Sequence, residues 1–505
     1  MKTVYCIISV SIAFLSLLTG CSLDKDPVSQ YSEVILGESK QDGDRIKYMT
    51  RAEMLTQYQA IYRRIKTDQG VWILNYLLLS ESHSDNAYGG TTDNETIPME
   101  NNAVDASHNG VTNDWTDFMR EISFANRVIC NIDAVPDPSL TPDERKQWKA
   151  EALIFRALIM FDMTRRWGNI PLVTFEGEDI TAENIEEVYP QYFPPQSTME
   201  EAYRQIEKDL LEALPQAPDN TGDKTRFSKA VARTLLAKVY AEKPLRDYDK
   251  VVQYCDEVIR DPGFALNENF SDLFAMNDDL TDLRQRSTKE SILEVNWFPG
   301  AGNWFTWLFG RNLSNWDEQF TWAKWVTPSR DLINAYEQEG DTTRLNQTVV
   351  YYACGWSYYY PAEHYAFLYK YRSSSSSFIK LRLADVILLK AEALAYTNDL
   401  SAAAALVNQI RRRAHLPDLS ASATSSRDNM IDAVLHERRL ELALEGHRWY
   451  DLVRYEKVVE VMNSLNARDP GRLKLARPFE EYSYLIPIPQ AELDKNSNLQ
   501  QNPGY

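Results

Sequence analysis

Three glutamates in the stretch 436–457 have a spacing that suits either acid–base chemistry or an ion network. If this stretch forms one helix, Glu437, Glu441 and Glu445 lie above one another at i, i+4 and i+8. Like charges at this spacing repel each other, so the chain must either bring cations to the row or use the row for chemistry.

Paired carboxylates could hydrolyse a glycosidic bond, because glycoside hydrolases need two of them across the sugar. The pair Glu437 and Glu441, however, lies in a stretch crowded with arginines, which favours a structural ion network. We expect its cations to come from the same stretch or from neighbouring helices. The candidates are Arg438, Arg439, Arg448, Arg156, Arg165 and Arg382.

The other groups of polar residues give weaker evidence for a reactive or metal-binding site. Asp278, Asp279 and Asp282 lack the ordered ligand and glycine spacing of a calcium loop, so a solvated loop or a helix cap is the simpler interpretation. The six histidines have no metal-ligand spacing. The sequence contains no GxSxG, HExxH, Walker A or GxGxxG motif. We therefore expect no catalytic residue, no metal and no cofactor.

Tryptophan is the residue type whose distribution points most directly to binding. Six of the 12 tryptophans lie within 297–325, among glycines and asparagines and with few aliphatic neighbours. Flat aromatic side chains stack on the apolar C–H faces of sugars and lose little rotamer freedom on contact. Filling a local core is the alternative use. We assign Trp297 and Trp325 to packing, since they adjoin a predicted strand and a predicted helix.

The start of the chain has the features of a lipoprotein signal peptide. An apolar run over 4–18 follows Lys2 and ends in Leu-Thr-Gly before Cys21. The run is too short to span a membrane. Small residues before a cysteine are typical of a lipobox, so we expect removal of residues 1–20 and lipidation of Cys21. An ordinary signal peptide is the alternative.

Charge and cysteine usage exclude other classes of protein. The net charge of −19 provides no extended basic face for phosphate groups, so a nucleic-acid partner is not expected. Beyond Cys21, the cysteines Cys130, Cys255 and Cys354 are odd in number and form no CxxC pair. This pattern argues against a disulfide framework or a zinc site, and we expect these cysteines to be small buried residues.

Helical periodicity dominates the chain outside the tryptophan-rich stretch. Thr50 and Glu53 form a capping-box signal, and Thr141 followed by Pro142 is another strong helix start. Paired helices with short turns and small residues at their crossings favour tetratricopeptide-like packing. The expected helices cover residues 50–66, 114–133, 141–167, 199–214, 228–242, 247–260, 380–396, 401–414 and 428–462.

Two long segments interrupt the helices. Residues 80–114 are polar and show little periodicity, and a loop this long inside a domain is usually functional or disordered. In the second segment we expect a strand over 290–297, a short helix over 328–337 and a solvated serine loop over 373–377. We therefore treat 21–505 as a single domain. Its helical scaffold lies mainly in 50–263 and 379–505, with a loop-rich insertion at about 264–378.

Several long motifs occur in one fixed order along the chain. They are the lipobox at 18–21, EALIFRALIMFDMTRRWGNIPLV at 151–173, RLADVILLKAEA at 382–393, ERRLELALEGHRWYDLVR at 437–454 and a tail at 485–505 that ends in NPGY. On these motifs the chain resembles the SusD/RagB family of Bacteroidetes outer-membrane lipoproteins.

The resemblance implies an all-α, tetratricopeptide-like scaffold of about four helix pairs, with loop-rich insertions and minor β-strands. It also implies a lipid-anchored, cell-surface protein of the outer membrane. Such a protein would capture an oligosaccharide or polysaccharide and deliver it to a SusC-like TonB-dependent transporter, without catalysis. Capture of peptides, as in the RagB branch, is the main alternative, and a glycoside hydrolase is a weaker one.

Family ligand sites come from variable loops, which by position are 80–115 and 297–325 here. No residue identity carries over from the family, so side-chain chemistry selects the candidates. The predicted glycan-binding residues are Asp85, Asn86, Tyr88, Trp304, Trp307, Trp316 and Trp322. With the motif at 437–454 among the family hallmarks, we interpret the stacked glutamates as a structural brace.

Overall fold

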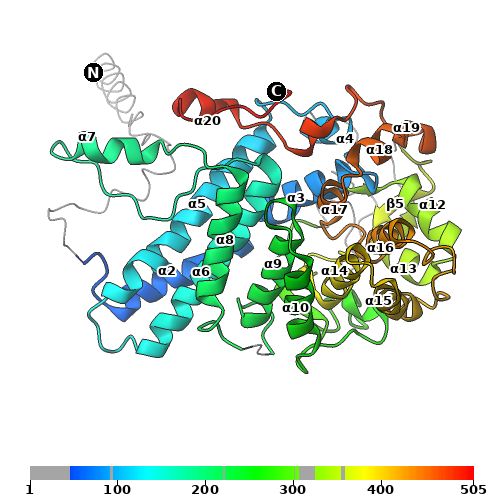
Figure 1. The fold of residues 1–505 in the computed structure, drawn as a ribbon, viewed down its shortest axis with the longest axis horizontal. Coiled ribbons are helices and arrows are strands. Elements are labelled where there is room, and N and C mark those ends of the chain that lie inside the picture. Colours follow the sequence, from blue (N-terminus) through cyan, green and yellow to red (C-terminus); the bar gives the residue numbers. More distant parts are fainter. Residues whose placement is uncertain (1–45, 91–94, 220–221, 301, 306–324, 354–358) are drawn as a thin grey trace, which may run out of the picture.

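The computed structural model describes residues 46–90, 95–219, 222–300, 302–305, 325–353 and 359–505 (Figure 1). Its main body is a stack of helices in which each helix packs against the next along the chain. In order, these are α2 (Arg51–Thr67), α5 (Asn109–Asn131), α6 (Pro142–Trp167), α8 (Met199–Ala213), α9 (Lys229–Ala241), α10 (Tyr248–Ile259), α14 (Leu383–Tyr396), α15 (Leu400–Arg413) and α16 (Arg427–Glu441). The predicted all-α, tetratricopeptide-like scaffold is thus confirmed.

Helix starts lie where the capping signals place them. Thr50 and Thr141 both form complete capping boxes, with Glu53 and Glu144 respectively. Helix α6 is buried on nearly all sides, and it ends at Gly168, whose φ is +73°. A Cβ atom at this position would lie 2.6 Å from a methyl carbon of Leu485, so close packing also favours glycine there.

Shorter elements complete the fold. The described part of the chain has three two-stranded antiparallel sheets, which pair β1 (Ala87–Tyr88) with β3 (Thr327–Pro328), β2 (Ser291–Val295) with β6 (Phe378–Arg382), and β4 (Val349–Tyr352) with β5 (Tyr365–Leu368). The remaining α-helices are α3 (Asn75–Leu77), α4 (Ile97–Glu100), α7 (Ile185–Val188), α12 (Arg330–Glu339), α13 (Thr342–Thr348), α17 (Arg448–Arg454), α18 (Val458–Asn463), α19 (Leu465–Arg468) and α20 (Gln490–Lys495). None of the helices within the described residues is both long and apolar enough to cross a membrane.

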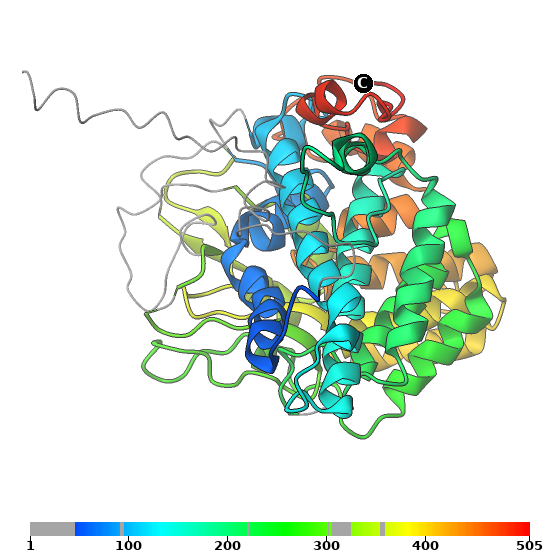
Figure 2. The same cartoon turned by 90° about the vertical axis from the view of Figure 1, so that its left-hand side faces the viewer.

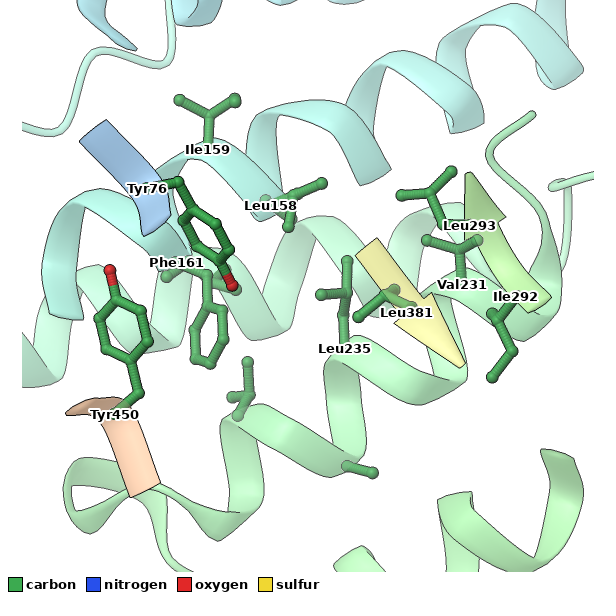
Figure 3. Packing of buried hydrophobic residues seen from close by; sticks show 14 of the residues in the cluster. Tyr76, Leu158, Ile159, Phe161, Val231, Leu235, Ile292, Leu293, Leu381 and Tyr450 are labelled. Atoms are coloured by element: carbon green, nitrogen blue, oxygen red, sulfur yellow. The ribbon is translucent and has the colours of Figure 1, made fainter. Parts of the chain in front are cut away.

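One hydrophobic core joins the two halves of the chain. Figure 3 shows Leu158 of α6 and Leu235 of α9 in the same cluster as Leu381 of β6 and Tyr450 of α17. Strand β2 contributes Leu293 to this cluster, and its partner strand β6 leads directly into α14. The insertion is therefore attached to the scaffold through a buried pair of strands.

The predicted helix over 428–462 is wrong in its second half. Helix α16 ends at Glu441, and α17 begins only at Arg448. Between them, Leu444 and Gly446 have φ angles of +63° and +93°. A Cβ atom on Gly446 would lie 1.9 Å from a ring carbon of Tyr76, so only glycine fits where this turn packs against a distant segment. Glu445 consequently does not share a helix with the other two glutamates.

Three further expectations need correction. The helix predicted over 380–396 starts later, because residues up to Arg382 pair in β6. The serine run at 373–377, expected in solvent, is buried except for the partly buried Ser374, and the side chains of Asn303 and Arg286 donate hydrogen bonds to its carbonyl groups. Cys255 is buried as expected, but Cys130 is exposed. Cys354 lies outside the described residues.

Candidate functional site

The stacked glutamates lie inside the protein, where they form ion pairs. Arg382 Nη1 lies 2.6 Å from a carboxylate oxygen of Glu441, Arg344 Nη1 lies 3.2 Å away, and Arg413 also donates to this carboxylate. Burial alone would raise the pKa of Glu441, but the charges of Arg413, Arg382 and Arg344 hold it well below its usual range. Glu441 is completely buried, so a substrate could not reach its carboxylate in this structure.

The rest of the network ties the insertion to the scaffold. Arg382 also pairs with Glu290 at 2.9 Å and with Glu445 at 2.6 Å. Glu437 pairs with Arg344 at 2.7 Å, and a second arginine, Arg411 of α15, lies 3.1 Å away. Of the cations considered from the sequence, Arg382 is confirmed as a partner of the row. Arg156 and Arg165 pair elsewhere, with Asp209 and Asp162.

Asp85, predicted from the first loop, is held between two arginines. Arg448 donates two hydrogen bonds of 2.7 and 2.9 Å to the Asp85 carboxylate, and the guanidinium of Arg439 lies 3.1 Å from it. Burial alone would raise the pKa of Asp85, but the charges of Arg439 and Arg448 hold it well below its usual range. The side chain is 0% exposed. Asp85 therefore binds this loop to the turn region around α16 and α17.

Asn86 and Tyr88 are also inside the protein. The side-chain oxygen of Asn86 accepts a hydrogen bond from Arg439 Nε at 2.9 Å. The Tyr88 hydroxyl donates to Asp469 at 2.6 Å, and its ring stacks on Tyr359 with a centroid distance of 4.1 Å. Both residues are buried, so in this structure they stabilise the loop through contacts inside the protein. Direct contact between these side chains and a ligand stays a prediction.

In the structure, the first loop, residues 80–115, contacts one end of the tryptophan-rich segment, residues 297–325. We call the chain at each end of this segment a root. Ser82 Oγ donates to the carbonyl of Trp325 at 3.2 Å, and Ala87 and Tyr88 pair with Pro328 and Thr327 in the β1–β3 sheet. The backbone of Asn86 also accepts a hydrogen bond from the N–H of Ser329 at 2.9 Å. The two segments selected from the sequence therefore meet, although their candidate side chains do not all face solvent.

The other root of the tryptophan-rich segment is fixed just as firmly. Asn303 Nδ2 donates to the carbonyl of Ser376 at 2.7 Å, and its backbone N–H donates to Ser374 O at 2.8 Å. Phe305 is buried and stacks on Tyr371, with ring centroids 4.1 Å apart. Between these two anchors, the Trp304 side chain is 39% exposed. The backbone of Trp304 is therefore anchored on both sides, while part of the residue faces solvent.

Trp304 lies at the end of helix α2. Its backbone N–H donates to the side-chain oxygen of Gln69 at 2.8 Å. A π-helical turn over Gly70–Leu74 follows Gln69, a distortion that is frequent at functional sites. Trp297 is buried and Trp325 is partly buried against the core, as assigned from the sequence. Trp307, Trp316 and Trp322 lie outside the described residues.

Sequence reasoning missed a second exposed ring near the end of helix α2. Phe298 is 50% exposed, and Lys66 Nζ of α2 lies 5.6 Å from its ring centroid. The guanidinium of Arg286 lies 4.6 Å from the same centroid, and it is held in place by Asp282 at 3.0 Å. The Pro-Gly turn that directly follows Phe298 was the available signal, because a turn places its neighbours at the surface.

We call Phe298, Trp304 and Lys66 the aromatic surface, and the buried Gln69 holds the backbone of Trp304 at its edge. It offers exposed rings for stacking and an exposed ammonium group that can donate hydrogen bonds, but no pair of carboxylates. Among the predicted acidic residues, Asp278 and Asp279 are exposed. No cluster of three or more His, Cys, Asp or Glu side chains within the described ranges could hold a metal ion. Exposed rings beside an ammonium group are chemically suited to contact with an apolar face that has polar edges.

Two family models cover almost the whole chain. The SusD family model matches residues 262–505. A second model, described as starch-binding associating with outer membrane, matches residues 36–241. Together they include both the helical scaffold and the insertion.

The chain is similar over nearly its full length to two SusD-like proteins. SusD-like proteins P38 and P2 from Formosa agariphila are 26% and 27% identical to it over 98% of this chain, and the matches cover 99% and 98% of these relatives. A solved structure described as a laminarin-binding SusD-like protein is 25% identical, with a TM-score of 0.70 and coverage of 91% of this chain and 100% of that one. A SusD superfamily protein from Bacteroides vulgatus has a TM-score of 0.74 at 18% identity, with 90% and 99% coverage.

Proposed function

The chain belongs to the SusD/RagB family, and from this membership and the aromatic surface we propose that it binds a glycan at the cell surface. The bound oligosaccharide or polysaccharide is then delivered to a SusC-like TonB-dependent transporter, and the protein itself does not alter it chemically. The observation that carries the proposal is the pair of exposed rings, Phe298 at 50% and Trp304 at 39%, beside the end of α2.

Both rings are suited to stacking on sugars. Exposed apolar patches with a polar rim are typical of ligand-binding surfaces. Trp304 is fixed by Asn303 and Phe305 on either side, so little conformational entropy is lost when a ligand binds. Lys66 adds a donor for hydroxyl or carboxylate groups at the rim.

The other predicted residues fit this proposal in two roles. Trp307, Trp316 and Trp322 follow Trp304 between the two anchored roots, and we propose that they extend the same stacking surface. Asp85, Asn86 and Tyr88 hold the root at 325–328, and we propose that they act on binding by positioning that segment.

A surface location is supported by the anchor predicted at Cys21 and by the outer-membrane association in the description of one matching family model. A non-catalytic role is supported by the burial and ion pairing of the two neighbouring carboxylates. Glu437 and Glu441 are neutralised by arginines, and their burial keeps them away from any ligand on the aromatic surface.

The test is a titration of the mature domain with laminarin as the first probe, followed by a glycan panel and a peptide panel. Trp304→Ala should weaken binding to the glycan that wild-type protein binds by about tenfold, equivalent to roughly 1.4 kcal/mol. Tyr189→Ala is the control, because Tyr189 is an aromatic residue in another part of the chain that is also exposed, at 52%. The affinity of this control variant for the glycan should equal that of the wild type.

Two outcomes would contradict the proposal. Binding of peptides with no response to any glycan would support the RagB-like alternative. Release of shortened products from a glycan by the wild-type protein would show a hydrolase.

A further inference from the structure

Two exposed cations of helix α2 lie beside the aromatic rings. Arg63 and Lys66 are three positions apart near the end of this helix, so both lie on one face of it. Lys66 Nζ lies 5.6 Å from the ring centroid of Phe298, and Arg63 is separated from Lys66 by a rise of about 4.5 Å. Figure 2 shows α2, in blue, with the helical stack on one side and green loops of the insertion on the other. The two charges therefore extend the aromatic surface along the helix.

The charges of Arg63 and Lys66 are not neutralised by neighbouring carboxylates. Arg64, the cation between them in the sequence, pairs with Asp68 at 2.5 Å, and Arg120 of α5 lies 3.4 Å from the same carboxylate. Within the part of the chain that the structure describes, neither Arg63 nor Lys66 forms an ion pair. The surface thus holds two positive charges that are open to a ligand.

A third cation next to Phe298 has a different role. Arg286 pairs with Asp282 at 3.0 Å, and its Nη2 donates to the carbonyls of Trp297 and Ser375 at 2.7 and 2.9 Å. These bonds neutralise the guanidinium and fix the chain directly before Phe298. The fold therefore uses the charge of Arg286 and leaves the charge of Lys66 available.

The helix dipole explains basic residues at this position only in part. Cations near the C-terminus of a helix are stabilised by the dipole, and Lys66 lies in the last turn of α2. Like charges three positions apart, however, repel each other. An anionic group bound between the side chains of Arg63 and Lys66 would offset this repulsion, and the sugar that carries it would lie close to the ring of Phe298.

The net charge of the chain does not exclude an anionic ligand. A charge of −19 repels a polyanion at a distance. At physiological ionic strength, however, interactions between exposed charges are largely screened beyond about 8 Å. Once a glycan is in contact with the aromatic surface, the charges next to Phe298 therefore decide the interaction, and these are Lys66 and the neutralised Arg286.

We propose that the glycan bound at the aromatic surface is acidic, and that Lys66 and Arg63 bind its carboxylate or sulfate groups. This inference rests on the proposed function for the presence of a glycan and adds the class of sugar. Trp304 and Phe298 contact the apolar faces of the sugar rings, and the two cations donate charge-assisted hydrogen bonds to the acidic groups.

The first test compares acidic glycans with their neutralised forms, on the full-length protein purified in detergent. The probes are polygalacturonate and alginate with their carboxyl-reduced forms, λ-carrageenan with its desulfated form, and the neutral glucan laminarin. Wild-type protein should bind at least one acidic glycan about tenfold more tightly than the matched neutral form, as expected for charge-assisted hydrogen bonds. A response to carboxyl reduction identifies a uronic acid, and a response to desulfation identifies a sulfated sugar.

The second test assigns the effect to the two cations. Lys66→Gln together with Arg63→Gln should weaken binding of the acidic glycan about tenfold, whereas Lys66→Arg should retain the preference for the acidic form. Lys146→Gln is the matched control, because Lys146 is an exposed lysine of α6 that also forms no ion pair within the described residues. It lies near the opposite end of α2, where Arg51 pairs with Glu144. Its affinity for the acidic glycan and its melting temperature should equal those of the wild type.

Three results would overturn the preference for an acidic glycan. They are binding to neutral glycans alone, equal affinity for an acidic glycan and its neutralised form, and binding of an acidic glycan that the double change leaves intact. The first two are measured on wild-type protein, so they decide the question even if a variant does not fold. Binding to neutral glycans alone removes this inference and leaves the proposed function standing. Absence of binding to every probe and to the wider glycan panel would contradict the proposed function and this inference together.

Discussion

The network around Glu441 and the aromatic surface differ in the exposure of the side chains that suggested a function. Around Glu441, several acidic and basic groups are packed with almost no exposure, and each charge is matched by an opposite one. On the aromatic surface, few groups are present, but Phe298 and Trp304 keep large exposed faces on a fixed backbone. The comparison teaches that exposure on a rigid support, rather than density of charged residues, marks the place to look for function.

The largest expected effect is the loss of stability in Glu441→Ala. This change leaves Arg382, Arg413 and Arg344 buried without their shared carboxylate, so the free energy of unfolding should fall by about 3–5 kcal/mol. Denaturant unfolding measures it. As a control, Glu200→Ala removes an exposed ion pair with Arg204 and should cost less than about 1 kcal/mol. A loss at Glu441 no greater than that at Glu200 would contradict the brace.

The same network predicts an acid-dependent stability. The folded-state pKa of Glu441 lies below its ordinary value of 4.5, so its contribution is complete above that pH and is lost as the pH falls toward the folded-state pKa. The free energy of unfolding should therefore decline between about pH 5 and pH 3, in line with this linkage. Glu441→Gln, which cannot titrate, should show a shallower decline over this range, and equal slopes would argue against the assignment.

A smaller effect is expected at the anchor of the tryptophan-rich segment. Asn303→Ala removes the donor to Ser376 and the acceptor for the N–H of Phe305, so stability should fall by about 1–2 kcal/mol. Glycan affinity should fall severalfold as well, because Trp304 loses its fixed backbone. Calorimetric titration alongside thermal unfolding separates the two effects. Unchanged affinity would mean that Asn303 serves the fold alone.

The smallest effect should come from Phe298→Ala. The ring contributes one stacking face and is already half exposed, so we expect a loss in glycan affinity of about 0.5–1 kcal/mol and no change in stability. Leu280→Ala, an exposed aliphatic change in the neighbouring loop, provides the control. Equal affinities for Phe298→Ala and wild type would restrict the surface to the tryptophans.

The sequence predicted the scaffold well because its signals are local. Thr50 with Glu53, and Thr141 with Pro142, place two helix starts at the observed residues. The break after Glu441 escaped prediction because it is created by contacts far away in the chain. The carboxylate of Glu81 accepts hydrogen bonds from the N–H groups of Gly446 and His447 at 2.7 and 3.0 Å.

From the sequence, the candidate site could be predicted only as a segment of the chain and not residue by residue. Residue type and spacing singled out the tryptophan-rich stretch, but the exposure of Trp304 depends on Gln69 and on the buried serine carbonyls, which are distant in sequence. For the same reason Asp85 looked like a binding residue. Its two arginine partners lie more than 350 positions later in the chain.

One comparison tests the central claim most directly, namely glycan titration of Trp304→Ala and Glu441→Ala beside the wild type, with unfolding measured on the same samples. We predict that Trp304→Ala loses about tenfold in affinity at wild-type stability, a change of roughly 1.4 kcal/mol. Glu441→Ala should lose stability while its folded fraction binds with wild-type affinity. Full affinity in Trp304→Ala, or lost affinity in a stable Glu441→Ala, would contradict the separation of binding surface from scaffold.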